Sequence, residues 1–391
     1  MRVLDLGQVN KLILNKQHLT ENAKIDDILQ ITDDLCGLHS TELTTSYFSL
    51  FARTKNFIKN DLENELYLNK NLARIRGMRR TIFIETKNFI PIVYAATSNI
   101  ISKSFEKYME FHKITLKEYQ EISKKILELL IGKELSASEI RKEVNSKSNI
   151  PAIIQFMCNY GLLIRGKPIK NWKDRRNNYA VFKNYFPNLN LTKFNENKAI
   201  QLLIEKYIKA YGPVSENDIS WWTGLTKTKI RNALSAINSK LREIKITNMK
   251  QPFLICEEDI DQLNNLPNSQ KQTLNILPRL DSYPMGYKDR ERYIDAKNYN
   301  LIFDRSGNIT STIFLDGIAV GVWDLEDKPE PMLKIFLFGS INEEYIDELY
   351  LKAQNVGEFF FDEIVKIKEC EKMIPLTERN AGGFMSPLKN S

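Results

Sequence analysis

Polar side chains gather in the segment GLHSTELTTS, residues 37–46, between two stretches whose apolar spacing predicts helices. An imidazole two positions before a hydroxyl can hold a water molecule or accept its proton. His39 and Thr41 are therefore candidate catalytic residues, and an imidazole of ordinary pKa would lose its acceptor nitrogen below about pH 6. The alternative is structural, because Ser40 or Thr41 can cap the following helix and a histidine beside a helix start often only hydrogen-bonds.

The sequence lacks the common motifs of nucleotide, metalloprotease and serine-nucleophile chemistry, namely a Walker A loop, GxGxxG, HExxH and GxSxG. Its four cysteines are widely spaced and only three histidines are present, so neither a disulfide framework nor a zinc site is expected. We therefore expect no metal and no cofactor, and only simple acid–base or water chemistry.

A second polar segment, DSYPMGYKDR at residues 281–290, concentrates aromatic and charged residues in a predicted loop. Tyr287 and Arg290 could face a ligand from this loop. The alternative is a Tyr–Asp–Arg network that only fixes the loop.

Charge is distributed unevenly along the chain, whose formal net charge is +7. Residues 1–250 carry 41 Lys and Arg against 25 Asp and Glu, a net charge of +16, whereas residues 251–391 carry 15 against 24, a net charge of −9. A polyanion such as DNA would prefer the first part. The alternative is a lysine-rich surface that only solvates the protein.

The length of 391 residues indicates two to four domains. A composition of 42% hydrophobic and 27% charged residues is that of a soluble protein and excludes disordered and fibrous classes. No apolar run approaches the roughly 18 residues that span a bilayer, and the N-terminus has no signal-peptide pattern. We expect a cytoplasmic protein.

One pattern of helices followed by a hairpin occurs three times in the first 250 residues, and its third copy is the clearest. A helix ends at Gly212-Pro213, a short helix runs from a capping pair at Ser215 to Gly224, and a third spans Lys227 to Leu241. Two strand candidates, REIKITN and PFLICEED, follow. This order is typical of a winged helix, and Lys227 and Lys229 lie off the apolar stripe as candidate DNA contacts.

The other two copies end in basic hairpins. In the second, a helix through residues 116–130, the short helix SASEIRKEV and a third helix starting at Pro151 precede LLIRGKPIKNWKDRRNNYAVF, with candidate DNA contacts Arg165, Lys167, Lys173, Arg175 and Arg176. In the first, helices through residues 28–35 and 43–51 precede ARIRGMRRTIFIET, which turns at Gly77 and offers Arg74, Arg76, Arg79 and Arg80. The alternative is that the three units form a scaffold without a ligand.

From about residue 274 the pattern changes to strands, with LNILPRLDSYPMGY, YNLIFDRSG, NITSTIFLDGIAVGVWDLED and PMLKIFLFG forming an antiparallel sheet beside one helix at 342–362. The final segment, MIPLTERNAGGFMSPLKNS, has no periodicity and is predicted to be a loop or tail. The sequence thus predicts an α+β protein of three tandem winged-helix units followed by a C-terminal β-barrel-like domain, with boundaries at 1–95, 96–190, 191–265 and 266–391.

Several of these segments together resemble the winged-helix DNA glycosylases of the AlkZ and AlkX (YcaQ) type. The resemblance spans nearly the whole chain and rests on GLHSTELTTSYFSLFAR, RIRGMRRTIFI, YGPVSENDISWWTGL, ILPRLDSYPMGYKDR, FLDGIAVGVW and IPLTERNAGGFMSPL. It implies three winged helices and a β-barrel arranged as a concave DNA-binding scaffold. It also implies hydrolysis of the N-glycosidic bond of bulky N7-alkylated guanines, including unhooking of interstrand crosslinks, without metal or cofactor.

In that family a Gln, an apolar residue and a Gln or Asp fall where this chain has His39, Ser40 and Thr41. The resemblance therefore implies that His39 positions the attacking water, that Thr41 assists it and that Ser40 contacts DNA, although a threonine cannot act as a base. The expected partner is duplex DNA, alkylated or crosslinked, and we expect a monomer associated with the nucleoid when bound. The alternative function is a noncatalytic DNA-binding or regulatory protein, although no heptad repeat supplies a dimerisation segment.

Overall fold

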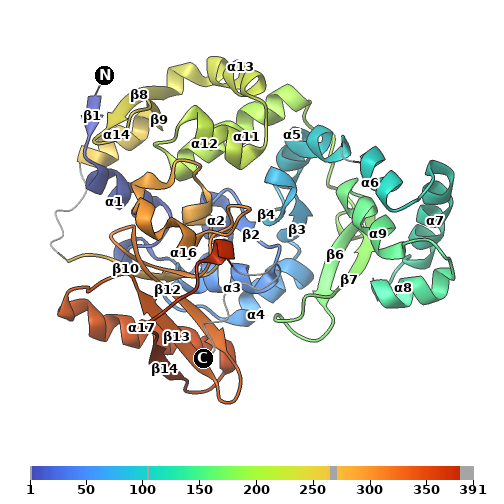
Figure 1. Cartoon of the computed structure of the whole chain (residues 1–391). Helices are drawn as coiled ribbons and strands as arrows, with labels where there is room; N and C mark the ends of the chain where they lie inside the picture. Colours follow the sequence, from blue (N-terminus) through green and yellow to red (C-terminus); the bar gives the residue numbers. More distant parts are fainter. Residues whose placement is uncertain (1, 104, 265–270, 379–391) are drawn as a thin grey trace.

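The computed structural model describes residues 2–103, 105–264 and 271–378. The fold is α+β: in these ranges helices surround four small sheets, three of them with three strands and one with five, and Figure 1 shows their arrangement. Among the described residues no helix is both long and apolar enough to cross a bilayer.

The first unit carries the segment around His39. Its sheet has the order β2-β4-β3, formed by β2 (Leu38–His39), β3 (Leu72–Arg76) and β4 (Ile82–Thr86). The surrounding helices are α2 (Ile28–Asp34), α3 (Leu43–Phe51), α4 (Lys59–Glu63) and α5 (Ile90–Ser102). The two predicted helices and the basic hairpin are therefore confirmed, and β2 adds a third strand to the hairpin.

A glycine sets the turn from α2 into β2. Gly37 has a φ of +96°, and a β-carbon there would overlap the carboxyl group of Glu85 on β4. Only a residue without a side chain adopts this conformation at this distance from a neighbour. The position of His39, two residues later, therefore depends on Gly37.

The N-terminal segment does not lie in the sheet of the first unit. Strand β1 (Arg2–Leu4) pairs in parallel with β8 (Leu241–Ile246), and helix α1 (Leu6–Lys16) packs against α11. Periodicity identifies a strand but not the sheet that it joins. The domain boundaries that follow from the sequence remain predictions.

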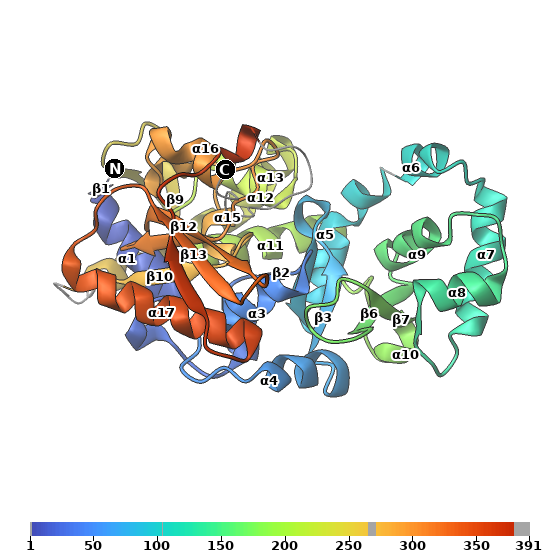
Figure 2. The ribbon, with the colours of Figure 1, turned by 60° about the horizontal axis from the view of Figure 1, so that its bottom comes forward.

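The second unit projects from the rest of the molecule (Figures 1 and 2). Its helices are α6 (Phe105–Phe111), α7 (Leu116–Leu129), α8 (Ala137–Val144), α9 (Ile150–Asn159) and α10 (Phe182–Tyr185). Its sheet has the order β5-β7-β6, formed by β5 (Leu135–Ser136), β6 (Leu163–Pro168) and β7 (Asn177–Val181). Apolar side chains of α7 and α9 form a hydrophobic core that is separate from those of the other units.

The third unit shows the predicted order of three helices and two strands. These are α11 (Glu196–Tyr211), α12 (Glu216–Thr223), α13 (Lys227–Ile237), β8 and β9 (Phe253–Cys256), followed by α14 (Glu257–Asn264). The capping box of Ser215 and Asp218 is confirmed, and Gly224 ends α12 in a left-handed conformation. The prediction that α13 extends to Leu241 was wrong, because Leu241 begins β8, where it pairs with Cys256.

The C-terminal unit is an open sheet of order β10-β11-β12-β13-β14, with no closure into a barrel among the described residues. Its strands are β10 (Leu274–Leu277), β11 (Thr312–Leu315), β12 (Ile318–Glu326), β13 (Met332–Leu337) and β14 (Lys366–Glu369). Helix α17 (Glu343–Phe361) packs against this sheet. The antiparallel expectation fails at β14, which runs parallel to β13 because α17 returns the chain to the same end of the sheet.

One predicted strand of this unit is helical. The stretch YNLIFDRSG forms the short helix α16 (Tyr299–Ile302) and a single bridge from Phe303 to Ile309. Periodicity alone does not separate a short apolar strand from a helical turn. The predicted C-terminal tail lies partly outside the described residues.

Candidate functional site

His39 lies on the edge strand β2, where it pairs with Phe83 of β4. The two rings meet edge to face with centroids 5.4 Å apart, and His39 is only 7% exposed. Its Nε2 lies 3.5 Å from the hydroxyl oxygen of Thr41, which is exposed. This distance is at the upper limit for a hydrogen bond, so both groups remain available to a third polar atom.

The surroundings keep the imidazole of His39 neutral. Burial and the charges of Arg79 and Arg279 lower the pKa of His39 to about 3, although Asp281 acts in the opposite direction. An ordinary imidazole pKa was the assumption from the sequence, and burial in the folded protein lowers this pKa. A neutral imidazole keeps one acceptor nitrogen throughout the physiological range.

Ser40 anchors the segment instead of facing the surface. It is completely buried, its N–H donates to the carbonyl of Ile82, and its hydroxyl and carbonyl oxygens both accept from Arg74. Arg74 is also buried and donates to Asn177 of the second unit at 2.6 Å. The prediction that Ser40 and Arg74 contact DNA directly is therefore wrong for this structure, because both side chains are buried.

Glu42 follows the segment directly and was missed by the sequence reasoning. Its carboxylate accepts from Arg175 of the second unit and from Arg279 of the C-terminal unit, each at 2.9 Å. An acid at the start of α3, beside a candidate motif, was the available signal. Glu42 thus joins three units beside His39.

A buried ion pair joins α3, the helix that follows residues 39–42, to the C-terminal unit. Arg53 of α3 binds both carboxylate oxygens of Asp281, at 2.7 and 2.8 Å, and both side chains are completely buried. The hydroxyl of Ser49 donates to the same carboxylate at 2.6 Å. A two-point pair of this kind fixes the orientation of both side chains, so the C-terminal unit is held in register with α3.

The remaining arginines of the first hairpin lie at its tip. Arg76 and Arg79 are half-buried and Arg80 is exposed, and Arg76 donates to the carbonyl of Arg80 at 2.5 Å. Burial lowers the pKa of both Arg76 and Arg79 to about 10. No ion pair to a carboxylate is found for these three side chains within the described residues.

The basic loop of the second unit is fixed to the rest of the protein by Trp172. This side chain is 7% exposed and packs on Tyr47 with ring centroids 4.7 Å apart, and on Phe48, Phe359 and Phe360. Of the predicted contacts in this unit, Lys167, Arg175 and Arg176 are exposed, Lys173 is half-buried against aromatic rings, and Arg165 is buried.

The predicted contacts in the third and C-terminal units differ in accessibility. Lys227 is exposed and Lys229 is half-buried, and both pair with glutamates. Tyr287 is completely buried and donates to the carbonyl of Tyr211. Its contacts therefore agree with a network that fixes the loop and not with a side chain that faces a ligand. Arg290 is 7% exposed and lies over the ring of Phe303.

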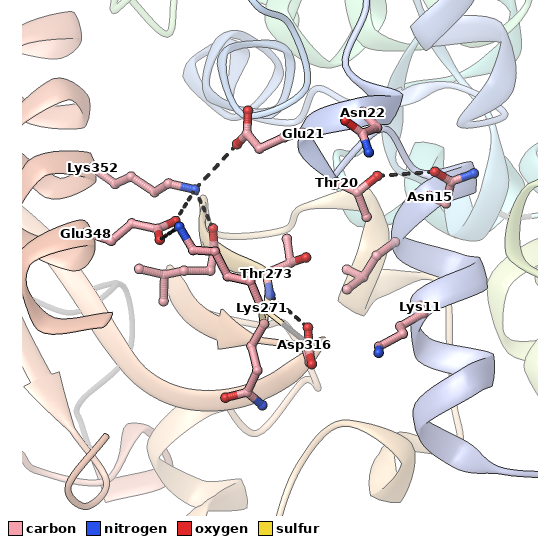
Figure 3. Close-up of a pocket in the computed structure, with 13 residues that line it drawn as sticks. Lys11, Asn15, Thr20, Glu21, Asn22, Lys271, Thr273, Asp316, Glu348 and Lys352 are labelled. Carbon is pink, nitrogen blue, oxygen red and sulfur yellow. Dashed lines mark hydrogen bonds and ion pairs between the residues drawn. The ribbon is translucent and has the colours of Figure 1, made fainter. Parts of the chain in front are cut away.

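A cavity of about 240 Å³ lies elsewhere, between α1, β10 and α17 (Figure 3). Lys352 pairs there with Glu21 and Glu348, and Lys271 pairs with Glu348. None of the residues from His39 to Glu42 lines it. No group of three or more His, Cys, Asp or Glu side chains in the described ranges is arranged to hold a metal ion.

Comparison with known proteins defines the class. Residues 32–349 match the family described as DNA glycosylase AlkZ-like. Because the match covers most of the chain, the protein belongs to the AlkZ-like DNA glycosylase family, which confirms the resemblance found in the sequence. Membership supports a DNA glycosylase that acts in DNA repair.

Among solved structures, a DNA glycosylase is similar to this protein over the whole length of that glycosylase chain. The Streptomyces sahachiroi DNA glycosylase AlkZ aligns with a TM-score of 0.78 at 16% sequence identity, covering 95% of this chain and 100% of that chain. At this identity the likeness shows a shared fold. No curated protein matches the chain.

Proposed function

We propose that this protein is a monofunctional DNA glycosylase that hydrolyses the N-glycosidic bond of bulky N7-alkylated purines, including those in interstrand crosslinks. The observation that carries the proposal is a neutral imidazole, His39, beside the exposed hydroxyl of Thr41, with arginines of the first and C-terminal units around it. Family membership supplies the reaction class. The lesion class rests on the resemblance to the AlkZ and AlkX type.

The reaction that we propose needs little from the protein as a base. Alkylation at N7 places a positive charge on the purine, so the electron pair of the C1′–N9 bond leaves with a base that becomes neutral. Water then forms a bond to C1′ of the oxocarbenium-like sugar and releases its proton to the surrounding solvent. A His39 whose pKa is about 3 is a poor proton acceptor, but its neutral ring can orient the water through a hydrogen bond.

Thr41 would assist from the solvent side. Its hydroxyl both donates and accepts, so it can hold the same water without removing the proton. Behind these two residues, Ser40 is held by Arg74, and α3 is held by the ion pair of Arg53 and Asp281. We assign these residues to positioning, because none of them reaches the surface.

We propose that the three helical units act as winged helices on duplex DNA and that the protein works as a monomer. Among the basic side chains predicted to contact DNA, we assign the accessible ones to the DNA backbone: Arg76, Arg79, Arg80, Lys167, Lys173, Arg175, Arg176, Lys227 and Lys229. Phosphate contacts of this kind release counterions, so affinity should fall steeply with salt and depend little on sequence.

The decisive experiment is incubation with a duplex that carries a single bulky N7-alkylguanine, followed by heating to cleave abasic sites. The proposal requires strand cleavage at the modified position, without metal. Binding with no base release from several alkylated duplexes would favour the alternative, a noncatalytic DNA-binding protein. Strong preference for one undamaged sequence would point to a regulator.

A further inference from the structure

Two arginines meet on the indole ring of Trp221, which belongs to α12 of the third unit. Arg79, from the hairpin tip of the first unit, places its guanidinium carbon 3.8 Å from the ring centre. Arg290, from the C-terminal unit, places its own 5.3 Å from the same ring and 3.6 Å from the ring of Phe303. Three units thus converge on one aromatic platform.

Neither guanidinium has a carboxylate partner within the described part of the chain. Arg290 donates to the hydroxyl of Tyr299 at 2.8 Å and to the carbonyl of Gly307 at 2.6 Å, which are neutral groups. Its Nε is buried and has no hydrogen-bond partner among the described residues. A charge that is removed from water without a counterion is unfavourable.

Two other buried arginines have a carboxylate inside the protein, whereas the buried Arg74 is held by the neutral groups of Ser40 and Asn177. Arg53 binds Asp281 at two points, and Arg292 lies 3.8 Å from the carboxylate of Asp218. Arg79 is only half-buried, so its counterion can come from outside the chain. The charge of Arg290 also contributes to lowering the pKa of Arg79, as expected for two cations that share a site.

The backbone at the hairpin tip is held in an unfavourable conformation. Arg79 and Arg80 have φ values of 52° and 59°, in the left-handed region that residues with side chains seldom adopt. Gly224, the last residue of the α12 turn, lies against the backbone of Arg79, where a β-carbon would come within 3.6 Å. Strain that the surroundings maintain in this way is typical of functional sites.

We propose that Arg79 and Arg290, which both contact the ring of Trp221, clamp a single phosphodiester of the DNA backbone next to the nucleotide at His39. The inference rests on the proposed function and specifies where the DNA is held. The half-buried Arg79 can bind phosphate oxygens at two points, and Arg290, whose Nη atoms already donate to Tyr299 and Gly307, adds its positive charge behind it. The ring of Phe83 packs on His39 and on Trp222, the residue after Trp221, with centroids 5.4 and 6.2 Å apart, so the platform lies near His39.

The test uses a duplex with a stable tetrahydrofuran abasic analogue, in which one phosphodiester at a time is replaced by an uncharged methylphosphonate. For the wild type, replacing one particular linkage beside the analogue should lower the affinity about tenfold, which is the scale of a charged hydrogen-bonded contact. For Arg79→Gln the same linkage should cost less than about twofold, because the contact is already lost. Equal sensitivity of both proteins at every linkage overturns the proposal.

Two control variants separate this effect from general loss of charge or fold. Lys366 lies on the distant strand β14 and pairs with Glu330. The variant Lys366→Gln should show the same dependence on each linkage as the wild type. Trp221→Phe keeps an aromatic platform and should retain most of the linkage dependence. An unchanged thermal midpoint in Arg79→Gln confirms that the variant is folded.

Free phosphate is the other source of the same chemistry. If inorganic phosphate raises the thermal midpoint of the wild type but not of Arg79→Gln, while every methylphosphonate duplex binds alike, the site takes a free anion and the proposal is wrong. Base release measured in parallel separates the two hypotheses. If the base is released but no methylphosphonate substitution affects the wild type more than Arg79→Gln, only the clamp proposal is wrong. If one substitution does so but no base is released, only the proposed glycosylase activity is wrong.

Discussion

Arg74 of β3 donates two hydrogen bonds to Ser40, from Nε to the hydroxyl at 3.0 Å and from Nη2 to the carbonyl at 2.9 Å. The residue between His39 and Thr41 is thereby fixed to the first hairpin. A third bond from Arg74 reaches Asn177 at 2.6 Å, so the same guanidinium joins the first unit to the second. The geometry of the candidate site therefore depends on a side chain that does not reach the surface.

Arg74→Ala should destabilise the protein by roughly 2 kcal/mol or more, because it leaves buried polar groups of Ser40 and Asn177 without a partner. Arg74→Lys should be intermediate, since a single ammonium cannot make all three bonds. Urea unfolding measures both. At a temperature where the variants are folded, base release should fall more than DNA affinity. A variant with normal stability and normal excision would remove Arg74 from the positioning role.

His39→Ala should lower single-turnover base release by about a hundredfold or more, with little change in DNA affinity. Thr41→Ala should cost less, because its hydroxyl only assists. His112→Ala, at a half-buried histidine of the second unit, is the matched control and should leave the rate unchanged. Wild-type activity in His39→Ala would exclude His39 from the mechanism.

The rate should not fall between pH 7 and pH 5 through protonation of His39. Burial and the charges of Arg79 and Arg279 lower its pKa to about 3, so the ring stays neutral and keeps its acceptor nitrogen over this range. The measurement is a pH profile of single-turnover excision for the wild type and His39→Gln. A loss near pH 6 in the wild type that is absent from His39→Gln would contradict the buried, neutral state.

Glu85→Gln should stabilise the protein more at pH 8 than at pH 5. Glu85 is buried, its Oε1 has no hydrogen-bond partner among the described residues, and burial raises its pKa well above the usual value. A raised pKa means that the folded state holds a proton that the unfolded state has released, so stability is lost as pH rises. Glutamine keeps the neutral form at every pH. Urea unfolding at several pH values checks this, with the exposed Glu363→Gln as control, and an offset independent of pH would contradict it.

Trp172→Ala should release the basic loop between β6 and β7. Its indole packs on aromatic rings of α3 and α17, and burial of an aromatic side chain is worth roughly 3 to 5 kcal/mol. The expected result is faster proteolysis within residues 169–176 and weaker DNA binding, because Arg175 and Arg176 lose their fixed position. Trp172→Phe should retain part of the protection. Equal proteolysis in all three proteins would show that the loop is held by other contacts.

The sequence by itself determined the local elements and the class of protein. Apolar spacing located most of the helices, and Ser215, Asp218 and Gly224 defined the ends of α12 because capping is a local interaction. The order of motifs around residues 37–46, 74–82 and 211–225 identified the family. Charge counting placed the excess of cations in residues 1–250, where the basic hairpins lie.

The tertiary structure decided which of these residues are accessible and what they contact. Ser40, Arg74 and Tyr287 looked like surface groups because their residue types are polar, but strand pairing and packing bury all three. The pKa of His39 depends on Arg79 and Arg279, which lie 40 or more positions away in the sequence. The convergence of Arg79 and Arg290 on Trp221 joins three units, and no periodicity contains such contacts, because they arise only when separate elements pack together.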